Sequence, residues 1–201
     1  MDKFLALSKE KQRSVIDAAL QCFGKHGYKK ASMRDIADLS GVSKPMLFHY
    51  FGTKLALYAF LTDYVKNTVM KGYQLHQLDG VEDLFDRILA ASSMKMSLLR
   101  SHRFLPPFMM SMLHETEEEA VAVVKATMPD PQKYNYDLVV RPEDEKKFKE
   151  GVDIKAVMRM IYLMGEGYGL EMMEGSWDYD KIDAEFQQSL AILKRNLYKE
   201  D

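Results

Sequence analysis

Apolar residues return every three or four positions near the start of the chain, which is the spacing of one face of an α-helix. One stripe holds five of them: Leu7, Val15, Ala19, Leu20 and Phe23. Ser8 can cap the first turn of this helix, and Gly24 or Gly27 can end it. The pattern therefore predicts a first helix that begins after Ser8.

A short second helix is predicted from Ser32 to Ser40. The Ser32 hydroxyl can cap it, Asp35 three residues later can reach back to the cap's N–H, and Ile36 and Ala37 supply a buried side. These signals place a helix directly after the basic end of the first one.

A third helix is predicted from Ser43 to about Phe51. Gly41 before it can take the positive φ that a tight turn requires, and Leu47 and Phe51 can seat the helix on the two earlier ones. Two short helices joined by a glycine turn can lay one helix in the major groove of DNA while the other crosses the backbone.

The remaining apolar patterns also favour helices over strands. The predicted helices span residues 54–75, 81–100, 107–114, 117–128, 143–150, 153–174 and 178–199, whereas residues 130–142 are left unassigned. We therefore expect an all-α fold. It consists of a three-helix, helix-turn-helix DNA-binding domain over residues 1–53 and a larger helical domain over residues 54–201.

The charge is divided unevenly along the 201 residues, although the net charge is only −2. Residues 1–55 hold ten basic and five acidic side chains, and the remainder holds 18 basic and 25 acidic ones. This asymmetry indicates that the N-terminal part meets a polyanion.

Several other classes of protein find no support in the sequence. No apolar run approaches the roughly 20 residues of a membrane span, and the single Cys22 lies on an apolar helix face, as a core residue does. No catalytic triad, phosphate-binding loop or metal motif is present. We expect a cytoplasmic protein that is not an enzyme and has no metal site and no cofactor.

The N-terminal third resembles the TetR family of transcriptional regulators. The resemblance is carried by Phe23, Gly27-Tyr28, Arg34-Asp35-Ile36-Ala37, Gly41-Val42-Ser43-Lys44, Leu47 to Lys54 and Leu57. It implies that the third helix reads DNA bases through Lys44, Pro45, Met46 and His49, and that Arg34 of the second helix also contacts them. It also implies phosphate contacts from Ser32, Tyr50 and Lys54. Phe48 stands where the family usually has tyrosine, so we expect it to pack against the sugar-phosphate backbone.

Methionine and aromatic residues are concentrated in the larger domain, where eleven of the fifteen methionines lie between residues 94 and 173. Such side chains can line an apolar ligand pocket, but they also form ordinary cores and dimer interfaces. The candidate ligand-binding residues are Tyr64, Met94, Phe108, Met112, Tyr162, Glu166, Tyr168 and Trp177. Glu166 would suit a cationic lipophile, or it faces solvent or an interface.

The resemblance further implies a homodimer built by residues 153–174 and 178–199, with apolar faces that include Val157, Leu170, Leu190 and Leu193. Two-fold symmetry then implies a roughly palindromic double-stranded operator. The expected function is a repressor released by a small apolar effector. The alternative is an architectural or partner-regulated DNA-binding protein without an effector.

Overall fold

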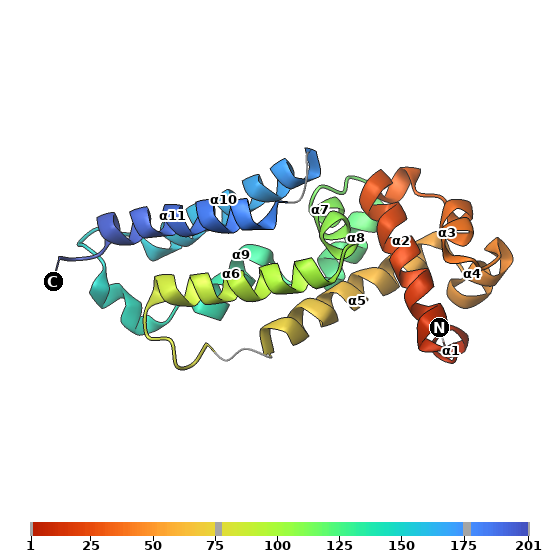
Figure 1. Ribbon diagram of the computed structural model, residues 1–201, viewed down its shortest axis with the longest axis horizontal. Coiled ribbons are helices and arrows are strands. Elements are labelled where there is room, and N and C mark those ends of the chain that lie inside the picture. The colour runs from red at the N-terminus through yellow and green to blue at the C-terminus, as the bar shows by residue number, and fades with distance from the viewer. Residues whose placement is uncertain (1, 75–77, 175–177, 201) are drawn as a thin grey trace. The chain divides into compact units, whose positions relative to one another are not determined.

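The computed structural model describes residues 2–74, 78–174 and 178–200. Within these ranges the chain forms α-helices, one 3₁₀-helix and a single isolated antiparallel bridge between Phe148 and Tyr198 (Figure 1), which confirms the all-α prediction. The elements are α1 (Asp2–Leu5), α2 (Lys9–Lys30), α3 (Met33–Ser40), α4 (Lys44–Phe51), α5 (Lys54–Gln74), α6 (Leu84–Ser101), α7 (Leu105–Leu113), α8 (Glu118–Thr127), α9 (Pro131–Val139), η1 (Pro142–Lys147), α10 (Ile154–Glu174) and α11 (Tyr179–Leu197).

The chain divides into two units, and helix α5 contributes to both. The first unit contains residues Met1–Thr68 and His102–Met128, and the second contains Val69–Ser101 and Pro129–Asp201. The functional boundary predicted after residue 53 coincides with the start of α5 and stays a prediction. None of the described helices has the length and apolar character needed to cross a membrane.

Helix α2 is interrupted at Gly27, one of the two glycines that the sequence suggested as its end. Ser8 caps it as predicted, since its Oγ accepts the backbone N–H of Lys11 at 3.4 Å. Gly27 has non-helical backbone angles (φ 69°, ψ 172°), and a short second segment continues to Lys30 beyond this kink. At Gly24 the helix meets α7 so closely that a Cβ would lie 2.8 Å from the backbone nitrogen of Phe108. Gly24 therefore permits close packing of two helices instead of ending one.

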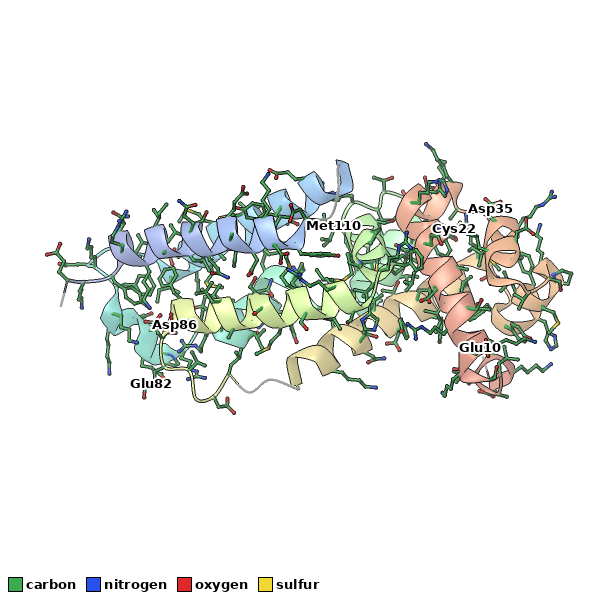
Figure 2. The ribbon with its side chains drawn as sticks, viewed as in Figure 1. Glu10, Cys22, Asp35, Glu82, Asp86 and Met110 are labelled. Carbon is green, nitrogen blue, oxygen red and sulfur yellow. The ribbon has the colours of Figure 1, made fainter. Side chains whose placement is uncertain are left out.

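An aromatic cluster forms the centre of the first unit. The ring of Tyr58 on α5 packs edge-on against Phe23 of α2 and Phe108 of α7, with centroid distances of 5.2 and 5.5 Å. Cys22 of α2, labelled in Figure 2, is buried, and burial raises the pKa of its thiol. These facts fit its predicted role as a core residue.

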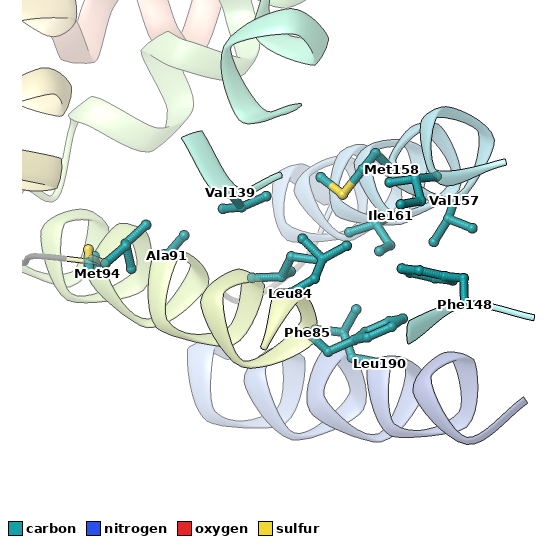
Figure 3. Packing of buried hydrophobic residues seen from close by; sticks show 13 residues of the cluster. Leu84, Phe85, Ala91, Met94, Val139, Phe148, Val157, Met158, Ile161 and Leu190 are labelled. Atoms are coloured by element: carbon teal, nitrogen blue, oxygen red, sulfur yellow. The ribbon is translucent and has the colours of Figure 1, made fainter. Parts of the chain in front are cut away.

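The second unit has its own core between α6, α9, α10 and α11 (Figure 3). Leu84 and Phe85 of α6, Ile161 of α10 and Leu190 of α11 are buried in it. The segment that the sequence left unassigned supplies helix α9, whose first turn is capped by Asp130 through the backbone N–H of Lys133 at 2.7 Å.

The helix predicted over residues 143–150 is wrong in type and extent. A 3₁₀-helix ends at Lys147. The buried carboxylate of Asp144 accepts the backbone N–H of Arg141 at 2.7 Å, and the chain beyond Lys147 pairs with the end of α11, where the N–H of Lys149 donates to Leu197 at 2.9 Å. These bonds hold the backbone out of an α-helix.

Most of the apolar residues predicted to face a dimer partner instead face the core of their own unit. Val157 and Leu190 are buried in the core of the second unit, and Leu193 packs against it. The large apolar side chains that stay exposed on α10 and α11 are Met160, Leu163, Leu170 and Ile192. Of the residues predicted for the dimer, Leu170 is exposed, and it is available to a second copy of the chain together with Met160, Leu163 and Ile192.

Candidate nucleic-acid interface

The helix-turn-helix has the caps and the turn that the sequence predicted. The Oγ of Ser32 accepts the backbone N–H groups of Arg34 at 3.1 Å and Asp35 at 3.4 Å, so it begins α3. Gly41 ends α3 in the left-handed conformation (φ 69°, ψ 19°) that a residue with a side chain rarely adopts. Helix α4 then starts after Ser43 with Lys44 and Pro45, although no hydrogen bond is made by the Ser43 side chain as a cap.

Helix α4 has a buried side and an exposed side. Leu47, Tyr50 and Phe51 are buried, as the prediction for Leu47 and Phe51 required. The exposed side presents Lys44, Pro45, Met46, Phe48 and His49. Lysine and histidine can donate hydrogen bonds to base edges, whereas proline, methionine and phenylalanine can contact thymine methyl groups or sugars. Large apolar groups next to a cation on a short exposed helix fit a DNA groove.

Arg34 is free to move from its present partner to DNA. It lies on the first turn of α3 with its Nε 4.0 Å from the carboxylate of Asp38, and both side chains are exposed. Exposed pairs of this kind contribute only about 0 to 1 kcal/mol, so the exchange for a phosphate or a base costs little.

Tyr50 is mainly a packing residue in this structure. Its ring lies 6.0 Å from that of Phe4 and 6.4 Å from that of Phe51, and the residue is buried. The phosphate contact implied for its hydroxyl stays a prediction, as does the one implied for Ser32.

Lys54 has a structural role that the sequence analysis missed. Its Nζ donates to the carbonyl oxygens of Tyr28 at 2.9 Å, Lys29 at 3.3 Å and Ala31 at 3.4 Å, and it lies 4.3 Å from the centre of the Tyr28 ring. These carbonyls belong to the end of α2, where a cation also interacts favourably with the helix dipole. No local pattern could have revealed this contact, because about 25 residues separate the partners.

Lys54→Met is expected to lower the free energy of unfolding by about 1 to 2 kcal/mol, because the last carbonyls of α2 lose their donor and the dipole its cation. Urea denaturation measures this loss. The control is Lys44→Met, which removes an equal charge from an exposed site and should stay within about 0.5 kcal/mol of the parent. Equal stabilities of the two variants would contradict the capping role.

Acidic residues in the α7–α8 connection and on the first turn of α8 hold the same end of α2. Glu115 accepts the backbone N–H of Tyr28 at 3.0 Å, Glu119 accepts the Tyr28 hydroxyl at 2.5 Å, and Lys29 pairs with Glu117 at 2.9 Å. Burial, together with the hydrogen bond to Glu119, raises the pKa of Tyr28. Burial alone would raise the pKa of Glu115, but the backbone N–H groups that it accepts hold that pKa below its usual value. The end of α2, directly before the helix-turn-helix, is thus fixed to the α7–α8 connection and to α8 within the first unit.

The residues predicted to bind an effector are distributed over both units. Tyr64, Phe108 and Met112 belong to the first unit, Met94, Tyr162, Glu166 and Tyr168 belong to the second, and Trp177 lies outside the described residues. Phe108, Met112 and Met94 are buried, and the hydroxyl of Tyr162 donates to Glu166 at 2.6 Å. A surface hollow of about 630 Å³ in the second unit contains none of them; Phe148, Lys149, Ile154 and Lys199 help to line it. The role of the predicted effector-binding residues as a ligand site stays a prediction.

Residues 15–60 match the family model of the bacterial regulatory proteins, tetR family. The same region is 44% identical over 61 residues to the transcriptional activator FasR of Mycolicibacterium smegmatis, which covers 30% of this chain and 28% of FasR. It is 34% identical over 50 residues to the transcriptional repressor AcnR of Corynebacterium efficiens, which covers 25% of this chain and 27% of AcnR. The chain thus spans little more than a quarter of the length of these curated relatives.

Solved structures share the fold over nearly the whole chain. A TetR family transcriptional regulator from Chloroflexus aurantiacus superposes with a TM-score of 0.77 at 15% identity, covering 100% of this chain and 99% of that one. FadR from Bacillus subtilis in complex with stearoyl-CoA superposes with a TM-score of 0.69 at 16% identity, covering 89% and 96%. At these identities the likeness establishes the fold.

Proposed function

We propose, from the premise that this chain belongs to the TetR family of bacterial regulatory proteins, that it controls transcription by binding an operator with helix α4 in the major groove. The exposed side of α4, with Lys44, Met46, Phe48 and His49 open to solvent, carries the proposal. The net positive charge of residues 1–55 supports it, because phosphate neutralisation supplies most of the affinity for DNA. Members of this family are regulators and not enzymes, in agreement with the sequence analysis.

The operator is proposed to be a roughly palindromic duplex bound by a homodimer. The dimer would form through α10 and α11, where Met160, Leu163, Leu170 and Ile192 leave apolar surface uncovered in a single chain. Two recognition helices related by a two-fold axis read half-sites about 34 to 36 Å apart, which is one turn of DNA.

The regulator is proposed to be a repressor that a small apolar effector releases from its operator. Structurally similar proteins support an effector, since one was solved with stearoyl-CoA and another, from Saccharomonospora viridis, with choline. The effector must bind more tightly to a form of the dimer whose recognition helices do not match successive major grooves. The alternative is a regulator without an effector, in which a partner protein changes DNA binding.

Lys44→Ala is expected to weaken binding to the operator by about 1 to 3 kcal/mol while changing the affinity for random duplex much less, if Lys44 donates to a base. The operator is recovered by selecting fragments of the protein's own genome, and fluorescence anisotropy at several salt concentrations measures both affinities.

The matched control is Lys155→Ala, which removes the same charge from an exposed position on α10. It should bind the operator as the parent protein does. If the parent shows no preference for any genomic fragment over random duplex, the proposed function is wrong. If Lys44→Ala weakens both duplexes equally, only the assignment of Lys44 to a base is wrong.

A further inference from the structure

The core-facing stripe of α6 is apolar and buried up to Ala91, and the next residue on it is the charged Lys95. Leu84, Ile88 and Ala91 follow one another along this stripe and are buried in the core of the second unit. Lys95 comes one helical turn after Ala91, so its Cβ points to the same side. Lys95 is nevertheless exposed to solvent. Solvent therefore reaches a position that the helix directs towards the interior.

On helix α10, too, the core-facing stripe passes from buried residues to a position that faces open space. Met158 and Ile161 are buried in the core, and Gly165 follows one turn after Ile161 on the same stripe. A Cβ at Gly165 would have no described atom within 4 Å. Ala91 and Met94 lie at the end of the cluster that is away from Phe148 (Figure 3). The packed core of the second unit is thus interrupted at Lys95 and Gly165, since Leu99, one turn beyond Lys95 on α6, is buried again.

Lys95 has little to compensate its charge. Burial lowers the pKa of its ammonium group, and the charge of Glu166 on α10 opposes that effect. A group that is exposed to solvent and yet strongly desolvated lies in a recess, surrounded by protein on most sides. Among the described residues, none accepts a hydrogen bond from Lys95 or forms an ion pair with it.

Glu166, in contrast, already has a donor. Its Oε1 accepts the hydroxyl of Tyr162 at 2.6 Å, and burial together with this bond raises the pKa of Tyr162. Of the two opposite charges in this recess, the carboxylate is hydrogen-bonded and the ammonium is not. In the free protein only water can accept hydrogen bonds from the Lys95 ammonium, so an anionic ligand would supply the acceptor that the described residues do not.

The geometry points to Lys95 as the anchor of an anionic head group, and to an aliphatic carboxylate as the effector of the second unit. The carboxylate would accept hydrogen bonds from the Lys95 ammonium, and the chain would lie in the space beside Gly165 and Met94. A cationic lipophile is disfavoured, because it would be repelled by Lys95 and would compete with Tyr162 for Glu166. This inference rests on the proposed function, since it names the effector class for the regulator.

The test compares three series of probes of equal chain length, each below its micellar concentration. They are the straight-chain carboxylates from hexanoate to octadecanoate, the matching alcohols and the matching alkyltrimethylammonium ions. Isothermal titration calorimetry gives their affinities for the full-length protein. We expect a carboxylate to bind, and to bind at least about tenfold more tightly than its alcohol.

Lys95→Met keeps the length of the side chain but removes the charge and the donors. It should weaken binding of the carboxylate by about 10- to 100-fold and leave binding of the alcohol within about threefold. Lys155→Met is the matched control, because it removes an equal charge from the surface of the same unit, and it should bind the carboxylate as the parent does. The ligand-free Lys95→Met protein should melt at or above the parent's temperature, since it loses a desolvated charge.

Four results would overturn the inference. They are carboxylate affinities that are equal in the parent and in Lys95→Met, tighter binding of the alkyltrimethylammonium ions, no binding by any carboxylate of the series, and a lower melting temperature for ligand-free Lys95→Met. Operator binding without ligand is measured in parallel on each variant. Intact operator binding with any of these results removes the effector class alone, whereas absent operator binding in the parent removes the proposed function.

Discussion

Asp144→Ala is expected to lower the free energy of unfolding by about 3 to 5 kcal/mol, because it leaves the guanidinium of Arg87 buried without a counter-charge. Both side chains are fully buried in the second unit and form an ion pair. Arg87 also donates hydrogen bonds to the backbone of two other segments of the chain. The Nε of Arg87 donates to the carbonyl of Val139 at 2.6 Å, and its Nη1 donates to that of Val81 at 3.0 Å.

The loss extends beyond the ion pair itself. The Asp144 carboxylate also accepts the backbone N–H of Arg141, whose side chain donates to the carbonyl of Leu78 at 2.8 Å. Removing the carboxylate therefore releases the start of η1 as well as the charge of Arg87. Each donor left unpaired in a buried site adds its own desolvation cost.

Urea denaturation of the parent and the variant measures this prediction. The control is Asp137→Ala, which removes an aspartate of the same unit that pairs with Lys133 on the exposed side of α9. It should cost no more than about 1 kcal/mol. The double variant Arg87→Met with Asp144→Leu should recover much of the loss, since apolar residues can replace a buried pair. A cost for Asp144→Ala as small as that for Asp137→Ala would show that the buried charge is not decisive.

The helix-turn-helix could be predicted residue by residue because its signals are local. The Ser32 cap, the positive φ at Gly41 and the inward positions of Leu47 and Phe51 each depend on residues fewer than ten positions apart. The charge of residues 1–55 depends on composition alone. Local propensity and periodicity therefore suffice for α3, α4 and the exposed side of α4.

Contacts between distant segments could not be predicted in this way. Glu119 meets Tyr28 across 91 residues, and Arg87 meets Asp144 across 57. The 3₁₀-helix at residues 142–147 follows from the second of these contacts, so the local pattern gave it the wrong type. Periodicity located apolar stripes on α10 and α11, but it does not say which stripe enters the core of the same chain. Val157 and Leu190 were therefore assigned to the dimer, although they are core residues.

The exposed stripe on α10 is a better candidate for the dimer interface. Met160, Leu163, Gly167 and Leu170 recur at spacings of three and four residues, so they lie on one side of the helix. Met160, Leu163 and Leu170 are 50%, 47% and 44% exposed, which is high for side chains of this size. A Cβ at Gly167 would meet no described atom within 4 Å, so a partner helix can approach closely there.

Leu163→Glu is therefore expected to convert the protein to monomers at micromolar concentration. A charge at the centre of this stripe would be buried without a partner on association. The operator affinity should fall by at least about 100-fold, because one half-site alone supplies only part of the specific contacts. The fold should survive, since Leu163 does not belong to the core of its unit.

Sedimentation velocity measures the oligomeric state, and fluorescence anisotropy measures the operator affinity. The matched control is Leu113→Glu, an equal change at a leucine of α7 that is 45% exposed and lies outside α10 and α11. It should leave both the dimer and the operator affinity intact. A Leu163→Glu protein that sediments as a dimer would exclude this stripe. A monomeric variant that still bound the operator as tightly as the parent would show that operator binding does not require the dimer. The proposal that a two-fold dimer holds two half-sites would then be wrong.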